Sequence, residues 1–110
     1  MPAKSPKIFP DEALLLAALG ERLRLARKRR KFTQALVAER SAISRATLCR
    51  VEKGDPAVTL GVYVRILGAL DLKSDIALLA AEDSLGRHLQ DSRLPRRSAS
   101  IPISRSPITS

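Results

Sequence analysis

The sequence predicts an all-α fold, and three observations support this prediction. Aromatic residues make up only 3% of the 110 residues whereas Leu, Ala, Val and Ile are abundant, a composition that suits packed helices better than a sheet. Apolar residues recur every three or four positions through the central part of the chain. Residues of the kinds that begin and end helices separate these periodic runs.

The first periodic run begins at Pro10 and Asp11 and is expected to end near Arg30. Proline is favoured in the first turn of a helix because that turn has no internal partner for the N–H group that proline lacks. One apolar stripe of this helix is expected to face the core: Leu15, Leu19, Leu23 and Ala26.

Two short helices are expected next, one from the cap residue Thr33 to about Arg40 and one from the cap residue Ser44 to Lys53. Gly54 should end the second, because glycine tolerates the left-handed conformation common after a helix. The apolar contacts between these helices are assigned to Val37, Ala38, Ile43, Leu48 and Val51. Two short helices at this separation have the spacing of a helix-turn-helix.

A fourth helix is expected to begin at Thr59, with an apolar side formed by Leu60, Val64, Leu67 and Leu70. Ser74 is placed to cap a fifth helix over residues 75–81, with Ile76, Leu79 and Ala80 facing inward. A weaker pattern indicates one more helical turn over residues 84–90.

The predicted organisation is one domain over residues 11–91 between two flexible ends. Residues 1–10 form an N-terminal arm with three prolines, and residues 92–110 form a basic tail rich in Ser and Pro. The arginines of the tail have three open roles, which are keeping the chain soluble, following a DNA backbone, or folding onto a protein partner: Arg93, Arg96, Arg97 and Arg105.

The charge of the chain favours a polyanionic partner, since the formal net charge is +9 and the sequence pI is about 10.8. The lone Cys49 and the lone His88 can form neither a disulfide nor a zinc site. We expect no metal, no cofactor and no enzymatic activity, because no catalytic triad or phosphate loop occurs. With no secretion signal and no membrane-spanning run in the sequence, the expected location is the cytoplasm.

The third expected helix has two chemically different sides. Leu48 and Val51 share one side, whereas Arg45, Ala46, Cys49 and Arg50 project from the other. Arginine can donate two hydrogen bonds to guanine, and small residues let a helix approach bases closely. Gln34 could hold a phosphate or a neighbouring base, and the helix N-termini at Thr33 and Thr59 could bind phosphates.

The run from Thr33 to Gly54, TQALVAERSAISRATLCRVEKG, resembles the lambda-repressor/Cro-like helix-turn-helix family, also called XRE, and the likeness extends over about residues 17–82. The resemblance implies a five-helix domain that binds the major groove of double-stranded DNA as a homodimer. It also implies a partly buried ion pair between Arg27 and Glu52. Together with the chemistry above, it gives these DNA-binding candidates: Gln34, Ser44, Arg45, Ala46, Thr47, Arg50, Thr33, Lys53, Lys28 and Lys31.

The sequence departs from the family pattern at two turns, where family members usually have glycine and this chain has Lys31 and Ala42. If these turns are left-handed, Ala42 should cost on the order of 1 kcal/mol. Several of the basic residues from Arg22 to Lys31 are expected to contact phosphates, although a solvated helix face is the alternative.

Residues 55–61 and the segments around residues 83–87 and 94–97 are similar to HipB-like antitoxins. That similarity implies a repressor that controls its own operon and neutralises a HipA-like Ser/Thr kinase. Two alternatives stay open, namely a stand-alone or prophage transcriptional regulator, and a protein-interaction module that inhibits a kinase with DNA binding secondary. The scarcity of aromatic residues disfavours a third, a single-strand RNA binder.

Overall fold

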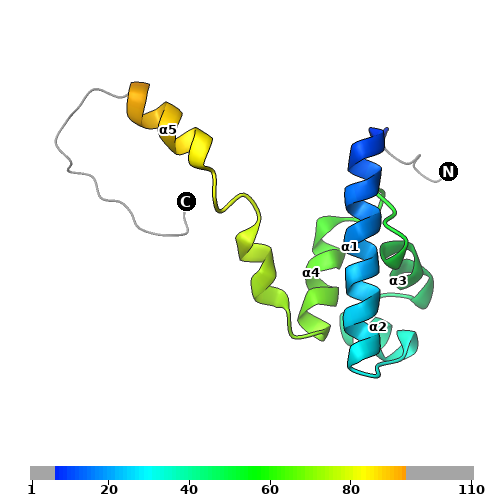
Figure 1. Ribbon diagram of the computed structural model, residues 1–110. Coiled ribbons are helices and arrows are strands. Elements are labelled where there is room, and N and C mark those ends of the chain that lie inside the picture. Colours follow the sequence, from blue (N-terminus) through cyan, green and yellow to red (C-terminus); the bar gives the residue numbers. More distant parts are fainter. Residues whose placement is uncertain (1–6, 94–110) are drawn as a thin grey trace. The chain divides into compact units, whose positions relative to one another are not determined.

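The computed structural model describes residues 7–93, so most of the predicted N-terminal arm and of the basic C-terminal tail lies outside the described residues. The all-α prediction is confirmed, since residues 7–93 contain helices and no strand (Figure 1). The helices are α1 (Pro10–Arg29), α2 (Gln34–Ser41), α3 (Arg45–Glu52), α4 (Leu60–Ala69), the 3₁₀ helix η1 (Lys73–Leu78) and α5 (Ser84–Arg93). None of these helices is long and apolar enough to pass through a membrane.

The chain divides into two compact units after Ala77. The first unit contains α1 to α4, and the second contains α5. All of the buried apolar residues found in the described chain belong to the first unit. The helix-turn-helix segment is therefore supported entirely by residues that precede Leu78.

α1 begins and ends as its sequence predicts. The N–H of Phe9 donates to Glu12 Oε1 at 3.1 Å, and Pro10 occupies the first helical position. At the other end, Arg27, Lys28 and Arg29 place positive charge in the last turn, where the helix dipole is negative. Both ends thus carry side chains that stabilise a helix of 20 residues.

A hydroxyl side chain caps each of the next three helices. Thr33 Oγ1 accepts from the N–H of Leu36 at 3.0 Å, Ser44 Oγ accepts from that of Thr47 at 3.0 Å, and Thr59 Oγ1 accepts from that of Val62 at 3.4 Å. Each bond satisfies a donor that the first helical turn leaves unpaired. The predicted starts of α2, α3 and α4 are confirmed.

Left-handed residues end four of the helical segments. Lys31 and Ala42 have φ values of 59° and 58°, so both turns at which family members usually have glycine are left-handed in this chain. Gly54 has φ 82° and Asp71 has φ 63°. In each case the next N–H donates back to a carbonyl of the last turn, as from Ile43 to Ala38 at 3.0 Å.

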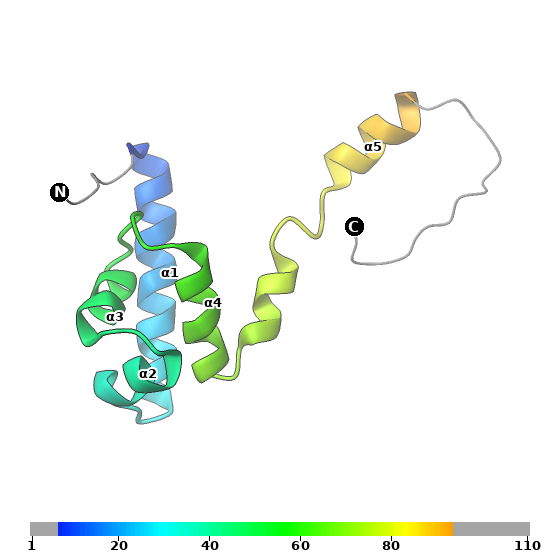
Figure 2. The same cartoon turned by 180° about the vertical axis from the view of Figure 1, so that it is seen from behind.

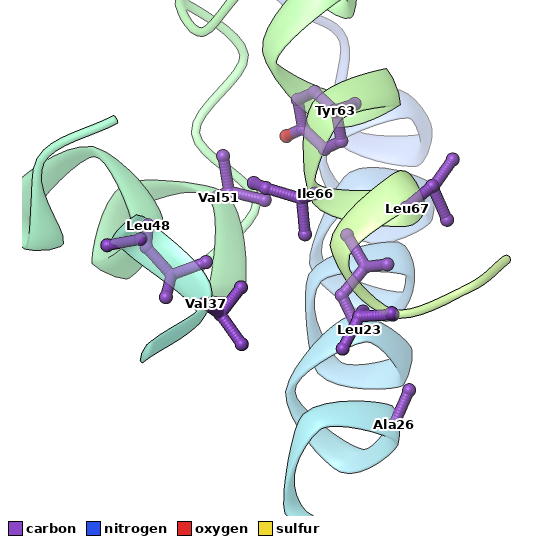
Figure 3. Packing of buried hydrophobic residues seen from close by; sticks show 10 residues of the cluster. Leu23, Ala26, Val37, Leu48, Val51, Tyr63, Ile66 and Leu67 are labelled. Carbon is purple, nitrogen blue, oxygen red and sulfur yellow. The ribbon is translucent and has the colours of Figure 1, made fainter. Parts of the chain in front are cut away.

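α1 to α4 enclose one apolar core (Figure 3). Its members come from all four helices and from the residue that follows α4: Leu23, Ala26, Val37, Ala38, Leu48, Val51, Tyr63, Ile66, Leu67 and Leu70. Leu48 and Val51 of α3 are 0% exposed. In both ribbon views α3 lies beside α1, and α2 packs against α3 and α4 (Figure 1 and Figure 2).

Two residues of the predicted apolar stripes do not face the core. Leu15 is 70% exposed and Leu60 is 60% exposed, so their inward assignment was wrong. The first turns of α1 extend beyond the helices that pack against it (Figure 1). The end of α3 lies against α1 further along, at Gly20. Leu60 is the first residue of α4, and the buried side of that helix is formed instead by Tyr63, Ile66 and Leu67.

The predicted α-helix over residues 75–81 is also wrong. The structure has the 3₁₀ helix η1 from Lys73 to Leu78, and Ala80 adopts a left-handed conformation with φ 59°. Ile76 packs partly against the core as expected, whereas Leu79 is 62% exposed and Ala80 is exposed. With three residues per turn, η1 brings few side chains to the core, and nothing buried holds the following residues in an α-helix. The weak pattern over residues 84–90 corresponds to the longer helix α5.

Candidate nucleic-acid interface

α3 is a short helix with one side anchored and the other side free. Leu48 and Val51 are fully buried, so they fix the helix against the rest of the first unit. Arg45, Ala46 and Arg50 are exposed, as the pattern of α3 predicts. The sequence pattern predicted that Cys49 also projects from this outer side. In the structure Cys49 is partly buried.

Ser44 and Thr47 form a small polar group at the start of α3. Ser44 Oγ accepts from the Thr47 N–H and also donates to Thr47 Oγ1, both at 3.0 Å. Ser44 is exposed and Thr47 is partly buried. The two hydroxyl groups therefore hold the first turn of α3 and remain at the surface beside Arg45.

The Arg27–Glu52 ion pair implied by the family resemblance is present beneath α3. Arg27 Nε donates to Glu52 Oε2 at 2.7 Å, and Nη2 donates to Oε1 at 3.0 Å. The third guanidinium nitrogen, Nη1, donates to the carbonyl of Phe32 at 3.1 Å. The hydrogen bond to Glu52 raises the pKa of Arg27, although burial opposes this shift. The pair links α1 to the end of α3 and to the turn before α2.

The structure gives the Gln34 side chain a protein partner at each end of its amide. Gln34 Nε2 donates to Glu52 Oε1 at 3.1 Å, and Cys49 Sγ donates to Gln34 Oε1 at 3.7 Å. Gln34 is partly buried at the start of α2. The amide therefore extends the Arg27–Glu52 pair into a network that joins α1, α2 and α3.

Arg50 makes an ion pair with a residue of the following turn. Its Nε donates to Asp55 Oδ2 at 2.8 Å, and the two side chains are 49% and 25% exposed. Asp55 Oδ1 accepts from the N–H of Ala57 at 2.8 Å. Both bonds lower the pKa of Asp55, and the bond from Arg50 has the larger effect. The carboxylate is therefore ionised at neutral pH.

The predicted phosphate-binding residues lie at the surface around the turns. Thr33, Lys28, Lys31 and Lys53 are all exposed. Two arginines of the same region contact the protein itself. Arg30 Nη1 donates to the carbonyl of Ala26 at 2.9 Å. The Arg40 guanidinium lies 5.1 Å from the centre of the Phe32 ring, in a cation–π contact. The three lysines keep their charges free of such contacts in the part of the chain that the structure describes.

Asp55 is a residue of this site that the sequence prediction missed. In the sequence, Asp55 is followed by Pro56, a pair that is common in turns and by itself indicates no role in a site. The sequence did contain an indication of this contact, because Asp55 follows Arg50 by five residues with Gly54 between them. A left-handed Gly54 reverses the chain and brings the two side chains together. The N–H of Asp55 also donates to the carbonyl of Arg50 at 3.0 Å, which closes this turn.

Comparison with known proteins agrees with this geometry. A family profile described as "Helix-turn-helix domain" matches residues 18–81, which is more than half of the chain. The matched region begins in α1 and ends after η1, so it includes both short helices and the complete core. No curated protein sequence matches the chain. A match of this extent, together with the anchored α3 and its exposed arginines, shows that the chain belongs to the DNA-binding helix-turn-helix domain family, within the XRE/Cro-like group.

Proposed function

We propose that the protein is a sequence-specific transcriptional repressor that acts in the cytoplasm and binds DNA as a homodimer. In this proposal α3 enters the major groove, and Arg45 and Arg50 contact base edges. Ser44, Ala46 and Thr47 allow the close approach of the helix. The protein binds DNA and catalyses no reaction.

One observation supports this proposal above the others. Leu48 and Val51 are 0% exposed while Arg45 and Arg50, on the same helix of eight residues, are exposed. A helix that is fixed on one side and carries arginines on the other can present two guanidinium groups in a defined register. The surrounding exposed lysines supply positive charge for phosphate contacts that are independent of sequence.

Selection of bound DNA from a random pool tests the proposal and returns the half-site. Binding is then measured for the selected site and for its single-base variants. We expect Arg50→Ala to lose discrimination at one base position, at a cost of about 1 to 3 kcal/mol. Arg65→Ala removes an exposed arginine of α4 and is the matched control. Full discrimination by the Arg50→Ala protein would refute the assignment.

Lys28 has a different expected signature because its proposed partner is a phosphate. Lys28→Ala should weaken binding to all sequences alike and reduce the dependence of affinity on salt by about one counterion. A titration over several salt concentrations measures both effects. Loss of discrimination at a single base would instead assign Lys28 to base recognition.

The homodimer is proposed because two copies on paired half-sites double the length of sequence that is recognised. The distance between half-sites in the selected DNA should then be about one helical turn or a multiple of it. Sedimentation of the protein with a two-site duplex should give two chains per duplex. A single unpaired half-site with one bound chain would contradict the dimer.

The more specific hypothesis is that the repressor is the antitoxin of a toxin–antitoxin operon. It is supported by the similarity of residues 55–61 to HipB-like antitoxins. The proposed partner is a HipA-like Ser/Thr kinase encoded beside this chain, and a stable complex that blocks autophosphorylation of that kinase is expected. If no adjacent kinase gene exists, the stand-alone repressor is the remaining function.

A further inference from the structure

We infer that Asp55 is the positioning residue for Arg50 and that it orients the guanidinium group to recognise one guanine in each half-site. The inference rests on the proposed DNA-binding function and goes beyond it. It assigns a specificity role to a residue outside α3 and names the base that Arg50 contacts.

The atoms used by the ion pair are the first part of the argument. Asp55 Oδ2 accepts from Nε of Arg50 at 2.8 Å, and among the described residues the Arg50 guanidinium makes no other hydrogen bond or ion pair. The two terminal nitrogens, Nη1 and Nη2, are therefore available. These nitrogens form the end of the guanidinium that can donate two hydrogen bonds to O6 and N7 of guanine. An acceptor on Nε thus fixes the group without occupying its base-binding edge.

Four hydrogen bonds besides the ion pair hold Asp55 in place, and one of them runs from the N–H of Val58 to the Asp55 carbonyl at 3.5 Å. Its N–H donates to the carbonyl of Arg50 at 3.0 Å, and its carbonyl accepts from the Tyr63 hydroxyl at 3.4 Å. Its Oδ1 accepts from the Ala57 N–H at 2.8 Å, which leaves Oδ2 for Arg50. Tyr63 is a core residue that is 6% exposed, so the turn is fastened to the core through this ring.

The energetic reason for such a support is conformational entropy. A free arginine side chain has several rotatable bonds, and ordering it on binding costs part of the affinity. The ion pair orders Arg50 before DNA arrives. The carboxylate also repels phosphates, so it lowers the affinity for DNA of every sequence. By ordering Arg50 it increases the discrimination at one base.

Asp55→Asn is the informative variant, with Asp75→Asn as the control for loss of one exposed negative charge. The amide oxygen of Asn can still accept from the Ala57 N–H, while its NH₂ group cannot accept from Arg50 Nε. In binding measurements on the selected site and its single-base variants, we expect discrimination at one guanine to fall about 2- to 12-fold, the range for leaving one long side chain unordered. Affinity for non-specific DNA should rise or stay unchanged.

Two further measurements separate positioning from a general structural effect. In the Arg50→Ala background, Asp55→Asn should cause no additional loss of discrimination, because the group that it orients is absent. In the free protein, the Arg50 Nε–H resonance should be protected from solvent exchange, and this protection should disappear in Asp55→Asn. The unfolding midpoint should change little.

The outcomes distinguish this inference from the function on which it rests. If the wild-type protein selects no sequence, the proposed function fails and this inference fails with it. If the wild type selects a site but Asp55→Asn keeps full discrimination at every guanine, only the role of Asp55 is overturned. The same holds if Asp55→Asn weakens discrimination equally with and without Arg50.

Discussion

The buried pair of Arg27 and Glu52 shows how single residues hold α3 in place. Arg27 is 8% exposed, and Glu52→Ala removes the main partner of its guanidinium group. Removing one partner of a buried ion pair typically costs about 3 to 5 kcal/mol. We expect the free energy of unfolding to fall by that amount in urea denaturation.

A surface ion pair of α1 supplies the control for this prediction. Arg24 Nη1 and Glu21 Oε2 are 3.0 Å apart, and their side chains are 39% and 53% exposed. Glu21→Ala should therefore cost less than about 1 kcal/mol. Equal losses for Glu52→Ala and Glu21→Ala would mean that the Arg27–Glu52 pair is not buried in solution.

Ala42 is a residue whose backbone conformation opposes its side chain. With φ 58° it occupies the left-handed region, which disfavours any residue with a Cβ atom by about 1 to 2 kcal/mol. Ala42→Gly should therefore raise the free energy of unfolding, by up to about 1 kcal/mol once the greater chain entropy of glycine is included.

The same substitution should have the opposite sign inside a helix. Ala18 is exposed in α1, so Ala18→Gly removes helix propensity and little packing, and it should cost about 1 kcal/mol. Thermal or urea unfolding of the two variants compares them directly. Destabilisation by Ala42→Gly would show that the turn between α2 and α3 is not left-handed.

At the scale of elements, the crossing of α1 and α3 depends on the absence of a side chain at Gly20. A Cβ atom there would lie 2.5 Å from the carbonyl oxygen of Val51 and 2.7 Å from that of Glu52. Backbone atoms cannot rotate away as a flexible side chain does. Gly20→Ala should displace the end of α3 and destabilise the fold by about 1 to 3 kcal/mol.

Gly68 provides the matched control in α4. A Cβ atom there would meet only the Cε atom of the Lys73 side chain, at 3.7 Å, which is an ordinary contact. Gly68→Ala should therefore stabilise the protein by about 0.5 to 1 kcal/mol through helix propensity. Similar effects of the two substitutions on unfolding would contradict the close crossing of α1 and α3.

The positions of α1 to α4 followed from the sequence because local chemistry determines them. Thr33, Ser44 and Thr59 act as caps through bonds within three residues, and a sequence pattern contains that information. The sequence pattern did not predict that Leu15 is exposed, nor that the short 3₁₀ helix η1 takes the place of an α-helix. Periodicity shows which side of a helix is apolar, but it does not show whether another element reaches that side.

For the candidate interface, the sequence predicted which side chains are exposed but not which partners they have. The exposed positions of Arg45 and Arg50 follow from the 3.6-residue period and the buried Leu48. The partners of Gln34 and Arg50 depend on distances between separate elements, so the sequence prediction assigned Gln34 to DNA and gave Arg50 no partner. Such contacts become visible only when the turn after α3 is placed in space.

At the scale of the whole molecule, the core and the chain after Ala77 should behave as independent units. The core cluster and the side chains packed against it end at Ile76, and α5 contains no buried residue. An isolated helix of ten residues is only marginally stable in water. A protein that ends at Ala77 should therefore keep its free energy of unfolding within about 0.5 kcal/mol of the full chain.

Urea denaturation of the full chain and of the shortened protein measures this difference, provided that both are studied at the same concentration. The cooperative transition reports the core, so its midpoint should be shared. Far-ultraviolet circular dichroism should lose only the signal of the removed residues. A loss of stability above about 2 kcal/mol would show that residues after Ala77 bury apolar surface of the first unit or of a second copy, and a loss that grows on dilution would identify the second copy.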